Sequence, residues 1–174
     1  MLDKRPSSTR FRTRMDWLES HHAFSFGHHY DPDRLGFGPL RVLNEDWISP
    51  GAGFPLHPHR EMEILSYVRA GALTHQDSEG NDAEIRPGRV QLMHAGTGIA
   101  HAERNEGGDP VHLLQIWIEP DTLGTRPGYE MLDFAHTPGV PTVLVSPEGT
   151  AGGLPLRQDA TVSALVLRRD QSHA

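Results

Sequence analysis

Short stretches in which apolar and polar side chains alternate run along most of the chain, and turn-forming residues separate them. A period of two residues is typical of a half-buried strand, because successive side chains point to opposite faces of a sheet. No stretch keeps a helical period for more than about two turns. We therefore predict strands at 11–15, 38–48, 62–68, 72–77, 83–86, 90–93 and 111–118, and further short strands at 142–146, 154–158 and 162–167.

The most apolar of these stretches, residues 111–118, is expected at the centre of the core. Many short strands joined by frequent turns predict an all-β domain, either a small antiparallel barrel or a double-sheet jelly roll. Such a barrel encloses a cavity of ligand size, and inward-facing polar residues would line it.

The composition narrows the class of protein. The chain has 174 residues, with 18 glycines, 14 prolines and no cysteine, and its formal net charge is −7. The negative charge argues against non-specific binding to nucleic acid or to an anionic membrane, and no apolar run approaches a membrane span. Without cysteine, a disulfide scaffold, a zinc–thiolate site and a thiol nucleophile are excluded, and a cytoplasmic location is expected.

A pair of histidines follows the glycine-rich turn at residues 51–53. His57 and His59 are two residues apart, so an extended chain places both imidazoles on one face. Pro58 between them disfavours helix at His57 and enforces the extended form. Two imidazoles on one face suit a first-row divalent metal, and the alternative is an exposed pair at a loop edge.

A second pair of the same kind strengthens the metal interpretation. His101 and Glu103 also stand two residues apart, after the glycine-rich stretch 95–98. Two strands that each give two ligands to one face make a set of three histidines and one carboxylate. Residues 95–98 lack the Lys-Ser/Thr of a phosphate-binding loop, so we interpret them as a tight turn that aims His101.

For the other histidines we do not predict a role in metal binding. His21, His22, His28 and His29 are expected to be solvated loop residues rather than a second metal site. His75 and His112 are expected to be buried and hydrogen-bonded, with a pocket position for His75 as the alternative, and the role of His94 is left open.

The residues around these ligands resemble the two sequence motifs of the cupins. Gly51-x5-His57-x-His59-x3-Glu63 is similar to the first motif, and Pro87-Gly88 through Gly98-x2-His101-x3-Asn105 is similar to the second. Over residues 9–167 the chain resembles the pirin family of cupins in particular, through Ser25-Phe26, Tyr30-Asp31-Pro32, Gly36-Phe37-Gly38, Asn44-Glu45-Asp46, Arg86-Pro87-Gly88 and Leu114-Gln115-Ile116-Trp117.

The resemblance implies a cupin jelly-roll barrel whose metal is held by His57, His59, His101 and Glu103. It implies Fe(II) as the usual metal, with nickel, zinc, copper, manganese or cobalt as substitutes. In cupins generally the carboxylate ligand would be Glu63, so here Glu63 is expected near the pocket, with a solvent-facing acid as the alternative.

Pirins usually carry two barrels, and this chain resembles only the opening strands of the second. We therefore predict a metal-binding barrel at residues 1–130 and an incomplete second cupin segment at 131–174. The apolar side chains on both faces of residues 162–167 predict that residues 142–167 fold back on the metal barrel or pair with another copy. A homodimer is the expected assembly.

Bacterial pirins include quercetin 2,3-dioxygenases, so the resemblance implies a flavonol and O₂ as substrates. Glu103 or Glu63 would then be the general base that takes the proton of the flavonol 3-hydroxyl group. Candidates to line the pocket, or else to be simple core, are Phe24, Phe26, Phe54 and Met62. The alternatives are a non-catalytic regulator that binds a transcription factor or metabolic enzyme according to its metal, and, less favoured, a sugar isomerase.

Overall fold

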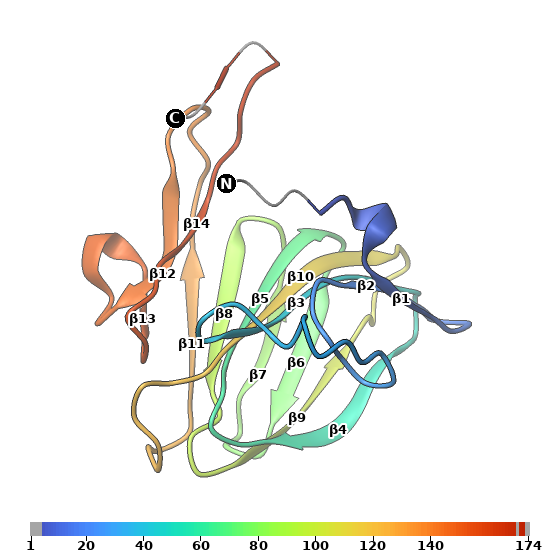
Figure 1. Cartoon of the computed structure of the whole chain (residues 1–174), viewed down its shortest axis with the longest axis horizontal. Helices are drawn as coiled ribbons and strands as arrows, with labels where there is room; N and C mark the ends of the chain where they lie inside the picture. The colour runs from blue at the N-terminus through green and yellow to red at the C-terminus, as the bar shows by residue number, and fades with distance from the viewer. Residues whose placement is uncertain (1–4, 170, 173–174) are drawn as a thin grey trace.

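Two facing antiparallel sheets form the body of the molecule (Figure 1). The computed structural model describes residues 5–169 and 171–172. The larger sheet runs, in spatial order, through β1 (Phe11–Arg14), β2 (Leu18–His22), β3 (Leu40–Ile48), β10 (Val111–Ile118), β5 (Glu63–Ala70), β8 (Arg89–His94) and β11 (Gly128–Asp133). The smaller sheet runs through β4 (Gly53–His59), β9 (Ile99–Arg104), β6 (Leu73–Asp77) and β7 (Asp82–Ile85).

A third sheet, in the order β13 (Leu154–Leu156), β12 (Thr142–Pro147) and β14 (Val162–Ala164), completes the strands. The only helical turns in the described residues are the 3-10 segments η1 (Ser7–Thr9) and η2 (Thr150–Gly152). The all-β prediction is therefore confirmed. Within the described ranges there is no helix long and apolar enough to cross a membrane.

Strand β5 shows how the alternating pattern builds two compartments at once. Ile64 and Val68 point into the space between the two large sheets, together with Ser66. Leu65, one residue away, points to the opposite face and joins a different core cluster. Because neighbouring side chains of a strand alternate between faces, one strand separates the barrel interior from a second core outside it.

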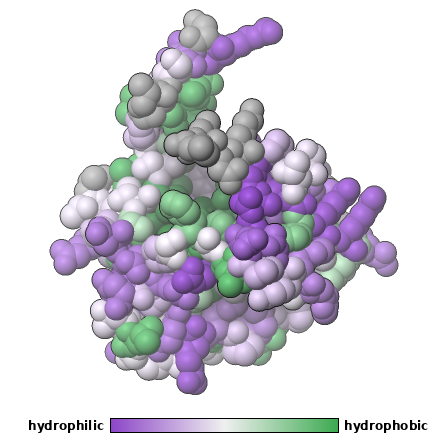
Figure 2. Space-filling view, viewed as in Figure 1, coloured by the Kyte–Doolittle hydropathy of each residue, from purple (hydrophilic) through white to green (hydrophobic). Residues whose placement is uncertain are grey.

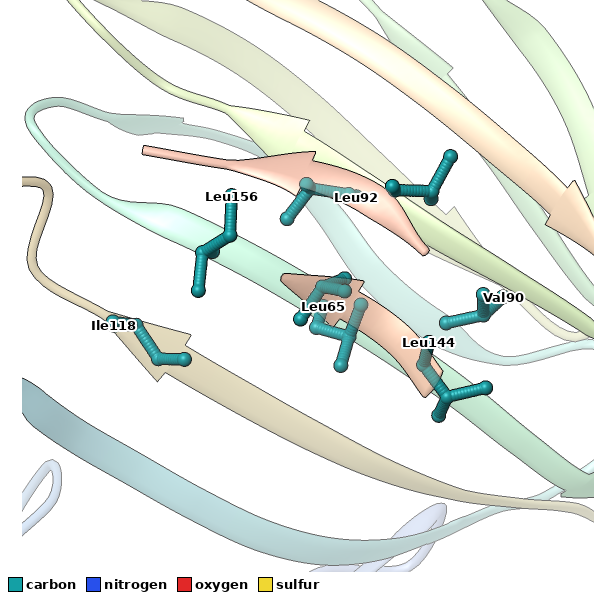
Figure 3. Close-up of a cluster of buried hydrophobic side chains, with 8 residues drawn as sticks. Leu65, Val90, Leu92, Ile118, Leu144 and Leu156 are labelled. Atoms are coloured by element: carbon teal, nitrogen blue, oxygen red, sulfur yellow. The ribbon is translucent and has the colours of Figure 1, made fainter. Parts of the chain in front are cut away.

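That second core joins the barrel to the C-terminal segment, which we define as residues 142–164. Figure 3 shows Leu144 and Leu156 of this segment among barrel side chains such as Leu65 and Leu92. The cluster comprises Leu65, Val90, Leu92, Ile118, Leu144, Val145, Leu154 and Leu156, each at most 7% exposed. Strands β12 and β13 thus fold back on the metal barrel, the first of the two arrangements expected for this stretch.

The boundary predicted after residue 130 stays a prediction, as does the homodimer. Strand β11 runs across that position and pairs with β8 as the edge strand of the larger sheet. The sequence pattern missed β11 because the preceding residues 119–127 are rich in proline and glycine. On the face shown in Figure 2, hydrophilic residues cover much of the surface, while hydrophobic residues show near its centre and on the upper projection.

The contact between β4 and β9 positions the two pairs of predicted ligands. Their register brings His57 opposite His101, with a shift between Phe54 and His57 that marks a bulge. At Gly53 an added Cβ would lie 2.2 Å from the carbonyl oxygen of Glu103, so only glycine lets the strands approach this closely.

Candidate metal centre

Three histidines converge on one point inside the barrel. His57 and His59 come from β4 and His101 from β9, and one ring nitrogen of each lies within 4.8 Å of the others. The ring centroids are 4.5 to 4.9 Å apart. The strand spacing that predicted two imidazoles on one face, with a third from a neighbouring strand, therefore describes the geometry correctly.

The protonation of these rings suits a cation. Burial, together with the charge of His57, lowers the pKa of His59 to about 4, and burial together with the neighbouring histidines lowers the pKa of His101 to about 2. Both are therefore neutral near pH 7. In the described part of the chain, the buried Nε2 atom of His59 has no hydrogen-bond partner. An unpaired buried nitrogen beside two further imidazoles fits a divalent metal.

A hydrogen bond also orients His57. Its Nδ1 lies 2.7 Å from the carbonyl oxygen of Pro55, which can only accept, so Nδ1 carries the proton and donates. The lone pair of His57 is consequently on Nε2. This is the usual way in which the hydrogen bond of one ring nitrogen leaves the other free for a metal.

His75 and Asp77 of β6 continue the cluster behind His101. The Nδ1 atoms of His75 and His101 are 3.3 Å apart, and Nε2 of His75 lies 2.9 Å from Oδ2 of Asp77. His75 is fully buried and its ring stacks on Tyr129, with centroids 4.6 Å apart. The expectation of a buried, hydrogen-bonded His75 is confirmed.

Glu103 lies beside the histidines but is held by the barrel wall. Its carboxylate accepts hydrogen bonds from Ser66 at 3.0 Å, from Gln91 at 3.4 Å and from Gln115. A carboxylate oxygen lies within 4.8 Å of ligand-capable nitrogens of His75 and His101. Complete burial raises the pKa of Glu103 to about 7 despite these donors.

Glu63 does not join this cluster. It lies on the same face of β5 as Leu65, and its carboxylate oxygen Oε2 is 2.6 Å from Nδ1 of His94. The backbone N–H of Arg157 donates to the same oxygen at 3.2 Å. Of the two carboxylates expected as general base, the structure thus brings only Glu103 to the histidines, because the alternation of β5 turns Glu63 to the C-terminal segment. The open question of His94 is settled by the same contact, since it bridges Glu63 and Glu130.

A cavity of about 340 Å³ opens on the cluster. Phe26 and Phe54 line it as expected, whereas Phe24 is not part of the lining and Met62 packs instead against Ile64 and Met93. The full lining is Thr13, Met15, Leu18, Ser20, His22, Phe26, Gly27, His28, Asn44, Asp46, Phe54, Pro55, His57, Glu103, Gln115 and Trp117.

His22 corrects an expectation from the sequence. It was expected to be a solvated loop histidine, but it ends β2, is 2% exposed and lines the cavity. Asn44, at 2.9 Å, and Thr13, at 2.8 Å, supply its hydrogen bonds. A sequence pattern could have predicted these inward-facing polar residues, because polar residues stand two apart at positions 20 and 22 in β2 and at positions 44 and 46 in β3. His28 is exposed, as expected, although it lies at the cavity lining.

Comparison with known proteins places this geometry in a family. The Pirin family profile matches residues 5–118. A quercetin 2,3-dioxygenase of Escherichia coli K12 is 43% identical over 172 residues, which cover 98% of this chain and 74% of that protein. A pirin-like protein of Caulobacter vibrioides is 40% identical over 99% of this chain and 75% of its own length.

A solved structure agrees with these sequence matches. The crystal structure of the bacterial pirin YhhW of Escherichia coli in complex with nickel(II) has a TM-score of 0.88 at 42% identity, and the match covers 92% of this chain and 69% of that one. The predicted cupin barrel is therefore confirmed, and the histidine and glutamate cluster is one that can hold a divalent metal. This chain belongs to the pirin family.

Proposed function

We propose that this protein is a metal-dependent dioxygenase of flavonols such as quercetin, with Fe(II) or another divalent metal held by His57, His59, His101 and Glu103. The observation that carries the proposal is that three convergent imidazoles, at least two of them held neutral by burial, adjoin a cavity with aromatic walls, which His57 and Glu103 help to line. The names of the relatives support the choice of substrate.

The cavity suits a flat aromatic substrate. Phe26 and Trp117 meet edge to face, with ring centroids 5.6 Å apart, and Trp117 also contacts His59 at 4.8 Å between centroids. The cavity volume of about 340 Å³ lies within the usual range of small-molecule sites. Apolar walls next to the histidines would keep bulk water from the reacting atoms.

A bound divalent metal would act as a Lewis acid toward the 3-hydroxyl oxygen of the flavonol. In this proposal Glu103 receives the proton of that hydroxyl group, and the choice is supported by the contact of Glu63 with His94 on the other side of β5. Gln115 and Ser66 would hold Glu103 in place during the transfer, through the hydrogen bonds that they donate to it. Overall, both atoms of O₂ enter the product while carbon 3 of the heterocycle leaves as carbon monoxide.

The test begins with anaerobic metal analysis of the purified protein, followed by reconstitution with Fe(II), Ni(II) and other divalent metals. Quercetin absorbance and carbon monoxide are then followed with and without O₂. We expect consumption that requires O₂ and disappears in His59→Ala. Binding of quercetin without turnover in every metal form would overturn the proposal and favour the regulatory role. A cytoplasmic location and a homodimer remain part of the proposal, to be checked by fractionation and light scattering.

A further inference from the structure

Strands β2 and β3 supply a polar wall to the cavity, made of Ser20, His22, Asn44 and Asp46. All four side chains are inward-facing, and their exposure is 2%, 2%, 4% and 2%. The register explains the grouping, because Ser20 stands opposite Asp46 and His22 opposite Asn44. Burying a polar group is unfavourable unless it has a hydrogen-bond partner. Each polar atom of this wall should therefore have a partner, either in the protein or in a ligand.

Part of the wall is satisfied within the protein. Nδ1–H of His22 donates to Oδ1 of Asn44 at 2.9 Å, and the Thr13 hydroxyl donates to Nε2 of His22 at 2.8 Å. The Ser20 hydroxyl donates to Oδ1 of Asp46. These bonds fix the orientation of both the Asn44 amide and the Asp46 carboxylate.

Two groups are left over. Among the residues that the structure describes, the side-chain hydrogen bonds of Asn44 and Asp46 use Oδ1 of each residue, and none involves the amide nitrogen of Asn44 or Oδ2 of Asp46. Both residues line the same cavity as His57 and Glu103. An unpaired donor and an unpaired acceptor thus belong to neighbouring inward-facing residues of one strand.

The polar groups around Glu103 are paired within the protein. Both oxygens of Glu103 accept hydrogen bonds, Oε1 of Gln115 accepts one from the Trp117 indole at 3.0 Å, and Oε1 of Gln91 accepts one from the Tyr129 hydroxyl at 3.1 Å. Apart from the histidine nitrogens of the candidate metal centre, the open positions are therefore those of Asn44 and Asp46, and they have the chemistry of a ligand-binding subsite.

We propose that Asn44 and Asp46 bind a phenolic hydroxyl group of the substrate, on a ring other than the one that carries the 3-hydroxyl group. The hydroxyl donates to Oδ2 of Asp46 and accepts from the amide N–H of Asn44. This inference rests on the proposed function, and it adds the requirement that the flavonol be hydroxylated beyond carbon 3. A substrate with a carboxylate at this position is disfavoured, because it would face the Asp46 carboxylate.

The specificity follows from the cost of leaving these groups unpaired. A flavonol without further hydroxyl groups removes water from Asn44 and Asp46 and gives nothing back. A hydrogen bond to a charged group changes affinity by about 10- to 100-fold. We therefore expect quercetin to bind the metal-loaded protein at least about 10-fold more tightly than 3-hydroxyflavone does.

The experiment is anaerobic equilibrium binding of quercetin and of 3-hydroxyflavone to the metal-loaded protein, with metal content measured in every sample. Asp46→Asn keeps an oxygen for Ser20 but replaces the accepting Oδ2 by a donor. Asn44→Asp keeps an oxygen for His22 but removes the free donor. The matched control is Asp109→Asn, because Asp109 is exposed and outside the cavity.

In either variant, the ratio of the dissociation constant of 3-hydroxyflavone to that of quercetin should fall toward one. The affinity for 3-hydroxyflavone should stay as in the parent protein. An unchanged preference in both folded, metal-loaded variants would overturn the subsite, and so would equal binding of the two flavonols by the parent. Because the measurement is of binding, it can succeed even if neither flavonol is turned over, which would refute the dioxygenase proposal alone. If both flavonols are turned over but the ratio of their affinities is the same in the variants as in the parent, the subsite alone is refuted.

Discussion

His75 and His101 face each other through their Nδ1 atoms, 3.3 Å apart. Burial opposes ionisation of Asp77, but hydrogen bonds from His75 and Asn81 outweigh it and lower the pKa of that carboxyl. Asp77 therefore accepts from Nε2–H of His75. Burial lowers the pKa of His75, so its ring is neutral and its lone pair is on Nδ1. His101 must then donate its own Nδ1–H, which leaves Nε2 of His101 free for a metal.

Breaking this chain should weaken metal binding without unfolding the barrel. In Asp77→Asn the amide can donate to Nε2 of His75, which favours the other tautomer of His75 and turns the His101 lone pair away from the metal. We expect the affinity for Ni(II) to fall about 10- to 100-fold in Asp77→Asn and in His75→Ala. Competition with a chromophoric chelator measures it.

The control for that prediction is His112→Ala. His112 stacks on Trp47 with ring centroids 4.4 Å apart and bonds to Glu45. It is therefore hydrogen-bonded as expected, but it is half-buried on the outer face and not in the core. Its removal should leave the metal affinity unchanged. Equal affinities in the Asp77, His75 and His112 variants would show that the chain of imidazoles does not orient His101.

Removal of single ligands should separate the two carboxylates. His57→Ala and His101→Ala should abolish stoichiometric metal binding, and Glu103→Gln should weaken it. Glu63→Gln should keep the metal, since Glu63 bonds to His94 and Arg157 instead. Metal analysis after gel filtration, with circular dichroism as a check of folding, decides which of the two carboxylates is needed for metal binding. Loss of metal in Glu63→Gln but not in Glu103→Gln would instead favour the ligand pattern of cupins in general.

The C-terminal segment should contribute to the stability of the whole barrel. Leu156 is 3% exposed in the core that the segment shares with β5 and β8. Leu156→Ala should lower the free energy of unfolding by about 2–5 kcal/mol, as burial predicts for a large core residue. The exposed Leu123, at 69%, is the matched control, and its replacement by Ala should change stability by less than about 0.5 kcal/mol. Urea unfolding measures both, and similar small effects would mean that the segment is not part of the folding unit.

The stability of the metal-free protein should depend on pH through Asp46. Burial raises the pKa of Asp46 from 3.8 to about 6. Between these values the folded protein binds more protons than the unfolded chain, so Asp46 lowers stability as the pH rises from about 4 to about 6. Relative to the parent, Asp46→Asn should thus gain stability over that window, by up to about 3 kcal/mol.

Urea unfolding at a series of pH values, with chelator present, tests this difference. Because Asp46 also raises the pKa of Glu103, the gain should extend toward pH 7 rather than reverse. A difference between the two proteins that stays constant from pH 4 to pH 7 would contradict the assignment of Asp46 as a buried acid that resists ionisation.

The convergence of the three histidines was predictable because their spacing and the geometry of strands leave few choices. His57 and His59 share a face in any extended chain, and a neighbouring strand with the same spacing supplies His101. The position of Glu63 was not predictable in the same way. Its parity on β5 is correct for a buried residue, but both faces of β5 are buried, so the pattern does not say which compartment receives it.

The polar wall was hidden for a similar reason. In β3 the buried residues are Val42, Asn44, Asp46 and Ile48, while Leu43 and Trp47 lie on the other face. Apolar side chains stand on both faces, so hydrophobicity alone does not identify the inward one. Inward-facing positions of a strand are usually apolar, but at a cavity lined by polar groups they are polar, and only the folded structure shows which positions these are.

The pairing of β4 with β9 also has a consequence for the order of events in a cell. Four strands, β5 to β8, are synthesised between the segments that carry His57 and His101. A chain that is still being translated therefore exposes a histidine pair long before its third partner exists, and long-range strand pairing is among the slower steps of folding. Metal capture must follow closure of these strands. Under the proposed function, the metal in the protein is then decided by the supply that meets the finished barrel, and growth medium becomes a variable in every measurement of metal content.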